Sequence, residues 1–197
     1  MNSLSAFSLK VLLFLMKAVF NFFEFCVLLR FLLQWVKADF RNPFCQFLIR
    51  MTSPLLHPLR RVIPGLYGLD FAAVLLFYGL IWLEVSLPPL MISQHWSAWS
   101  LLSAFLMAIH FYLNVTFFLI LFSSFMSWLP NARYHPIGIL LNLLTEPYFR
   151  VIRRVIPNIG GFDFSPLIAL ILIQILCFAE ISVFGSSSFA VYLDPNL

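Results

Sequence analysis

The sequence predicts an all-α integral membrane protein with four transmembrane helices, arranged as two parallel tandem hairpin repeats. Hydrophobic residues make up 62% of the chain and charged residues only 10%, whereas a soluble domain carries about a quarter charged residues. Four stretches are long and apolar enough to cross a bilayer, which takes about 20 residues. A string of residues also recurs at constant spacing, which indicates a duplicated unit.

The repeated string is the clearest motif of the chain. Its first copy begins Arg60-Arg61-Val62-Ile63-Pro64 and ends at Asp70, and its second begins Arg153-Arg154-Val155-Ile156-Pro157 and ends at Asp163. The same register is kept by Asn21 and Asn114, Trp35 and Trp128, Thr52 and Thr145. This unbroken correspondence predicts two units, residues 1–92 and 93–197.

Each unit is expected to contain a span, a linker and a second span. All four spans should be helices, because a lone segment in lipid satisfies its backbone hydrogen bonds only within itself. The first span is too long for a secretory signal peptide, so we expect it to be retained. The predicted spans are at about 9–36, 71–91, 99–129 and 166–184, with linkers 37–70 and 130–165.

Local residues predict where the second and fourth spans begin and where the second ends. Asp70 is expected to cap the free amides at the start of the second span. Ser165 followed by Pro166 should do the same for the fourth, with proline at the first helical position. Pro88-Pro89 is expected to end or bend the second span.

The linkers are expected to carry a short amphipathic helix each. After Asn42-Pro43, apolar residues recur at helical spacing, and the second linker repeats the pattern after His135-Pro136. Such a helix lies in the membrane surface or packs on the spans. Further prolines then predict stiff turns in both linkers; these are Pro54, Pro58 and Pro147.

The basic residues predict the orientation. Both linkers are rich in Lys and Arg, whereas the loop between the units and the C-terminal tail have none. The positive-inside rule therefore places both linkers in the cytoplasm and both termini outside. Because each unit has an even number of spans, the second enters the membrane from the same side as the first, unlike an inverted repeat.

Three interpretations of the paired arginines stay open. Arg60, Arg61, Arg153 and Arg154 could attract anionic lipid headgroups, at about 1 kcal/mol per residue near the surface. One arginine of each pair could instead bind the aspartate of its own unit, which would fix the linker to the span. The third interpretation is orientation alone, for which any basic residue would serve.

The repeated string resembles the YggT family of bacterial membrane proteins, which includes the YlmG proteins of Gram-positive bacteria and plastid relatives. The shared pattern is Asn-Pro, Thr-x-Pro, Arg-Arg-Val-Ile-Pro and Gly-x-Asp, with His135 in place of the first asparagine in the second copy. The resemblance covers nearly the whole chain, in both copies. The resemblance implies a small protein of the bacterial inner membrane. It further implies links to osmotic-stress tolerance, cell-division gene neighbourhoods and, in plastids, nucleoid and thylakoid organisation.

Polar residues inside the spans are the second group of candidates, because ionisable groups in lipid are costly. Lys17, Asn21 and Glu24 share one face of the first span, and His110 and Asn114 occupy the corresponding positions of the third. They predict either a path for protons or solutes, or ion pairs and amide hydrogen bonds that hold the helices together. Further candidates are Arg30, Glu84, Gln174 and Glu180. Glu84 and Glu180 fall toward the outer ends of their spans, where we expect contact with water.

The sequence therefore predicts a non-enzymatic membrane scaffold or assembly factor that acts through its basic linkers. The alternative is a component of ion or small-solute transport that uses the polar stripes. The histidines and cysteines have no metal-ligand spacing, and no cofactor is expected. Expected partners are the lipid bilayer, membrane proteins or further copies of the chain. Direct nucleic-acid binding is not expected, because the basic residues form no continuous face.

Overall fold

A computed structural model describes residues 3–63, 70–92, 99–129, 135–156 and 163–184. These residues form six helices and contain no strand, as expected of an all-α protein. The helices are α1 (Ser3–Trp35), α2 (Pro43–Val62), α3 (Phe71–Ile92), α4 (Trp99–Trp128), α5 (Pro136–Val155) and α6 (Ser165–Phe184).

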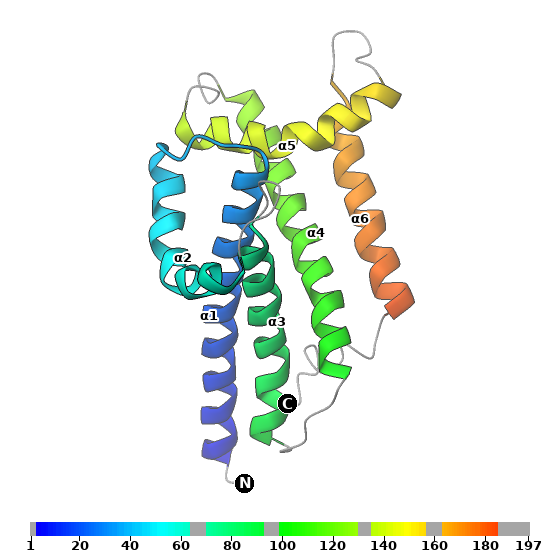
Figure 1. The fold of residues 1–197 in the computed structure, drawn as a ribbon. Helices are drawn as coiled ribbons and strands as arrows, with labels where there is room; N and C mark the ends of the chain where they lie inside the picture. The colour runs from blue at the N-terminus through cyan, green and yellow to red at the C-terminus, as the bar shows by residue number, and fades with distance from the viewer. Residues whose placement is uncertain (1–2, 64–69, 93–98, 130–134, 157–162, 185–197) are drawn as a thin grey trace.

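Four of the helices are long and apolar enough to cross a membrane: α1, α3, α4 and α6. In Figure 1, α1 and α4 run from the lower to the upper end of the molecule, and α3 and α6 run back down. Helix α5 lies across the upper end, and α2 lies beside α1. The two remaining helices are thus the linker helices of the sequence.

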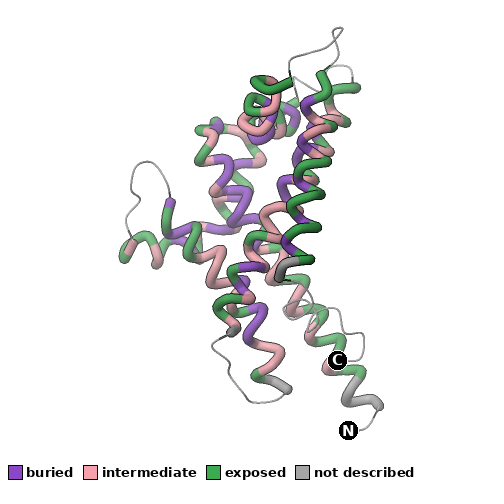
Figure 2. Tube along the Cα trace, turned by 90° about the vertical axis from the view of Figure 1, so that its right-hand side faces the viewer, coloured by how far each residue is buried: buried purple, intermediate pink, exposed green. Residues whose placement is uncertain are grey.

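The outer sides of the spans expose apolar side chains. Phe14 of α1 is 70% exposed and Phe178 of α6 is 73% exposed, and exposed positions run along the length of the helices in Figure 2. A soluble protein rarely leaves a continuous apolar surface of this kind open to water. The exposed surface of the spans is therefore suited to contact with lipid.

The largest buried cluster joins the two halves of the chain. It contains Leu29 and Leu33 of α1, Leu48 of α2, Leu119 of α4 and Leu140 of α5. Since these residues come from the first span of each half and from both linker helices, the linkers form part of the core.

Both linker helices are longer than the sequence predicted. Each spans 20 residues, and prolines lie inside them instead of in turns: Pro54 and Pro58 in α2, and Pro147 in α5. Each proline removes one backbone hydrogen bond from its helix. The buried side of each linker helix offsets this cost, so the expectation of proline-fixed turns is wrong.

The spans begin differently in the two halves, for a reason visible in the sequence. Asp70 accepts a hydrogen bond from the backbone amide of Ala73 at 3.3 Å. Pro166 takes the place of Ala73 in the second half and has no amide hydrogen. Asp163 therefore accepts from the amide of Ser165 at 2.9 Å, and Ser165 itself is not the cap. Pro88 and Pro89 do not end α3, since the helix continues through both prolines to Ile92, close to the predicted end of the span at about residue 91.

Candidate functional site

The first linker helix is tied to the following span by an ion pair. Arg60, near the end of α2, binds Asp70, just before α3, through both Nε and Nη2, and the Nε–Oδ2 distance is 3.2 Å. The side chain of Asp70 is only 6% exposed. Of the three interpretations of the arginine pair, an ion pair with the aspartate of the same unit is the one that describes Arg60.

The second linker helix carries the corresponding pair in a more exposed form. Arg153 donates to Asp163 from Nε at 3.1 Å and from Nη2 at 2.7 Å, and from Nη1 to Glu146 at 3.3 Å. Burial alone would raise the pKa of Asp163. The hydrogen bonds from Ser165 and Arg153 outweigh that effect and hold the pKa below its ordinary value.

The second arginine of each pair points elsewhere. Arg61 and Arg154 are exposed, and neither forms an ion pair with any residue that the structure describes. The next residues, Val62 and Val155, are 79% and 78% exposed. These four residues, called the linker surface below, thus occupy equivalent places in both halves.

A buried contact that the sequence analysis missed joins each first span to its linker helix. Arg30 of α1 is 6% exposed and donates to Thr52 Oγ1 of α2 at 2.6 Å. In the second half, Ser123 of α4 and Thr145 of α5 lie 3.0 Å apart through their hydroxyl groups. The repeat register could have revealed this contact, because both pairs have the same separation along the chain.

The intramembrane residues of the first half form a buried cluster. Glu24 of α1 and Glu84 of α3 are each 1% exposed, and both interact electrostatically with Lys17. Asn21 is half-buried on the same helix. The expectation that Glu84 contacts water was wrong, because Glu84 lies on the side of α3 that packs against α1.

The second half places a different pair between its spans. Nδ1 of His110 on α4 lies 3.0 Å from a carboxylate oxygen of Glu180 on α6. Glu180 is 8% exposed, so the expectation of water contact was wrong here too. Asn114 donates to the backbone carbonyl of His110 within its own helix at 3.0 Å. The polar stripe of α4 is therefore occupied by internal hydrogen bonds.

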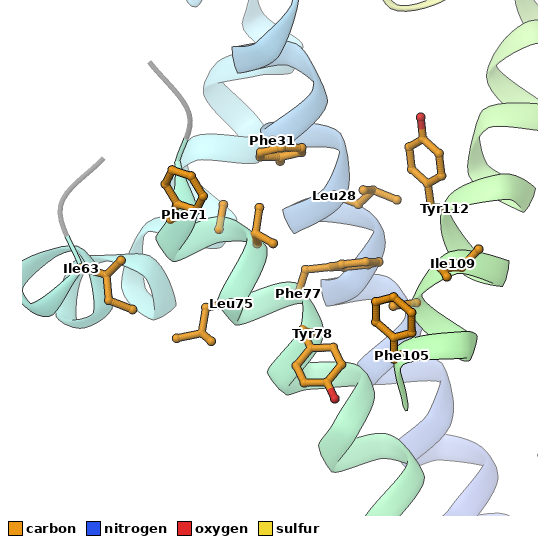
Figure 3. Close-up of a pocket in the computed structure, with 13 residues that line it drawn as sticks. Leu28, Phe31, Ile63, Phe71, Leu75, Phe77, Tyr78, Phe105, Ile109 and Tyr112 are labelled. Carbon is orange, nitrogen blue, oxygen red and sulfur yellow. The ribbon is translucent and has the colours of Figure 1, made fainter. Parts of the chain in front are cut away.

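An apolar groove of about 720 Å³ opens between α1, α3 and α4. Figure 3 shows aromatic side chains around it, among them Phe31, Phe77 and Phe105. Nothing in the lining would position a polar substrate, apart from the hydroxyl groups of Tyr78 and Tyr112. Tyr78 donates to the carbonyl of Leu101 at 2.8 Å.

Neither the cysteines nor the other ligating side chains form a metal site in the described ranges. No three His, Cys, Asp or Glu residues come together there. Cys26, Cys45 and Cys177 are buried free thiols, and burial raises the pKa of the Cys45 thiol. The two prolines of the repeated string, Pro64 and Pro157, lie outside the described residues.

Comparison with known proteins identifies one family. The family model of CCB3/YggT matches residues 9–91 and 102–182. YggT of Escherichia coli strain K12 is 33% identical over 168 residues, covering 85% of this chain and 88% of that protein. Protein PA0392 of Pseudomonas aeruginosa is 35% identical over 180 residues, covering 83% and 85%. A protein encoded in the proC 3' region of Vibrio alginolyticus is 36% identical over 188 residues, covering 94% and 97%. No solved structure matches.

Proposed function

Because this chain belongs to the CCB3/YggT family, we propose that it is a non-enzymatic scaffold or assembly factor of the bacterial inner membrane. In this proposal, the two linker helices hold membrane lipids and partner proteins at the cytoplasmic face. The same role would connect the protein to tolerance of osmotic stress, as its family resemblance implies.

The observation that carries this proposal is the linker surface. In each half one arginine is bound internally, and the next arginine is exposed beside a valine that is about four-fifths exposed. A basic side chain beside an exposed apolar one suits the boundary between headgroups and acyl chains. Each arginine near an anionic surface contributes about 1 kcal/mol. Repetition in both halves gives two such contacts on one molecule.

The arrangement of the helices supports two parallel hairpins with cytoplasmic linkers. The spans α1 and α4 run in the same direction, and so do α3 and α6 (Figure 1). Such an arrangement brings both linkers to one side of the bilayer, and their arginines favour the cytoplasm. A cytoplasm-active reporter fused after Leu197 should be silent, and activity there would contradict the proposed orientation.

The scaffold proposal is tested by separating the two arginines of each pair. A photo-crosslinking residue at Val62 or Val155 should capture neighbouring membrane proteins or lipid in native membranes. The same residue at Val74, a 42% exposed position of α3, controls for random collisions in the bilayer.

Arg61→Ala with Arg154→Ala should abolish this capture, and impair growth after osmotic downshift, at an unchanged protein level. Arg60→Ala with Arg153→Ala should instead lower the protein level, because it removes the internal ion pairs. Unaltered crosslinking to every neighbour and unaltered growth in the first double variant would refute the scaffold proposal.

Transport is the second candidate, favoured by the buried charged groups between the spans of each half. It predicts ion flux through wild-type protein in proteoliposomes, altered by Lys17→Leu with Glu24→Leu at constant protein level. Absence of flux in the wild type would rule this candidate out.

A further inference from the structure

We propose that Glu24 and Glu84 form an intramembrane proton-binding site in which the two carboxyl groups share one proton. Glu24 lies on α1 and Glu84 on α3, both within candidate spans. All four of their carboxylate oxygens are buried, and none accepts a hydrogen bond from the residues that the structure describes. This proposal does not depend on the linker surface.

The two carboxyl groups lie on α1 and α3, which pack against each other, and they act on each other electrostatically. Two ionised carboxylates can only accept hydrogen bonds and leave each other's buried oxygens without a donor, whereas a proton on one of them would let it donate to the other. In a medium of low dielectric constant, two neighbouring carboxylates do not both stay ionised. The burial of both groups without hydrogen-bond partners therefore points to a bound proton.

The charge balance around Glu24 and Glu84 also indicates one bound proton. Lys17 acts on both glutamates, and one ammonium group balances one carboxylate. One negative charge is left, and a buried charge without a partner costs several kcal/mol. The charged groups of the packed elements are engaged elsewhere: Arg30 with Thr52, Arg60 with Asp70, His110 with Glu180, and Arg153 with Glu146 and Asp163.

A proton suits this site better than a metal ion does. Hard cations such as Ca²⁺ and Mg²⁺ take six or more oxygen ligands. Among the described residues, no three His, Cys, Asp or Glu side chains lie close enough together to hold a metal ion. A proton needs only the two facing carboxyl groups.

Comparison of the two halves shows that packing does not require the carboxylates. In the repeat register, Glu24 corresponds to Phe117 and Glu84 to Cys177. Phe117 and Cys177 belong to one apolar cluster between α4 and α6. The same pair of spans is thus packed in the second half with uncharged side chains, so the two acids of the first half serve another purpose.

Infrared spectroscopy of the full chain in bilayers of neutral lipid tests this site. The C=O stretch of a protonated carboxylic acid is distinct from the bands of a carboxylate. At neutral pH the wild type should show this band with the intensity of one acid. Glu24→Gln or Glu84→Gln should abolish it, because Lys17 balances the single remaining carboxylate. Lys17→Met should about double it, because both acids must then be neutral.

Glu180→Gln is the matched control, since it removes an intramembrane acid that is bound to His110, and it should leave the band unchanged. Absence of the band in the wild type would overturn the proposal, whatever the variants do. So would a band that survives both glutamine substitutions, or one that Glu180→Gln removes. Loss of the band on adding sodium or potassium at constant pH would identify a metal-cation site instead, and overturn it as well.

Discussion

The two aspartates that end the linkers give a stability comparison within one molecule. Asp70→Asn and Asp163→Asn each remove one negative charge and keep an oxygen that can cap the next helix. Any difference between the variants therefore reports the ion pair and not the cap. Asp70 is 6% exposed beside Arg60, whereas Asp163 is 31% exposed beside Arg153.

The expected losses follow from this difference in exposure. Hydrogen bonds to charged groups contribute about 1.5–3 kcal/mol, and removing one partner of a buried pair costs about 3–5 kcal/mol. Arg60 is 39% exposed and regains some hydration, so Asp70→Asn should cost about 2–3 kcal/mol. An exposed pair contributes about 0.2–1 kcal/mol. Arg153 also keeps Glu146, so Asp163→Asn should cost no more than that range.

The free energy of unfolding is measured by titrating the protein in mixed micelles with a denaturing detergent and following helical circular dichroism. The difference of about 2 kcal/mol corresponds to more than a tenfold change in the unfolding equilibrium. Equal losses in the two variants, or a larger loss in Asp163→Asn, would show that burial does not set the strength of these pairs.

Two further predictions use the same measurement. Thr52→Val should cost about 1.5–3 kcal/mol of unfolding free energy, because it removes a hydrogen-bond partner of the buried Arg30. Thr145→Val removes only neutral partners and should cost about 1 kcal/mol. Equal costs in the two variants would contradict this ranking. The pKa of Asp163 is lowered on folding, so its contribution is full above its unfolded value of about 4 and is lost as the pH falls through the lower folded value. Asp163→Asn should remove this acid-dependent part of the stability, and an unchanged pH profile would contradict the assignment.

The sequence predicted the spans well, because their signal is local. Length and apolar composition are enough to identify α1, α3, α4 and α6, and the structure places them within a few residues of the predicted bounds. Prolines misled the prediction inside α2, where Pro54 and Pro58 indicated turns. Burial of one side of that helix, including Leu48 and Leu56, outweighs the local preference, and such packing depends on residues that are distant in the chain.

The polar contacts were only partly predictable. Repetition identified the arginines and aspartates of the linkers, and their pairing was one of the interpretations left open. Glu84 and Glu180 were assigned to water from their position along the spans. Position along a helix does not show which side meets a neighbour, and both side chains lie on a packed side. Their roles depend on helix rotation, which periodicity does not fix in a helix that is apolar all round.

The two halves also show which buried charges the fold needs. Ser123 meets Thr145 in the second half at the place where Arg30 meets Thr52 in the first. A neutral hydroxyl therefore suffices to join a first span to its linker helix. A buried arginine is costly unless it is fully bonded, and Arg30 donates also to the carbonyl of Ile49 at 3.4 Å and to Ser53 Oγ at 3.3 Å. The charges of Arg60 and Asp70 act on the guanidinium group of Arg30. The first half thus connects its buried charge to the ion pair next to the linker surface, whereas the second half keeps the same geometry without that connection.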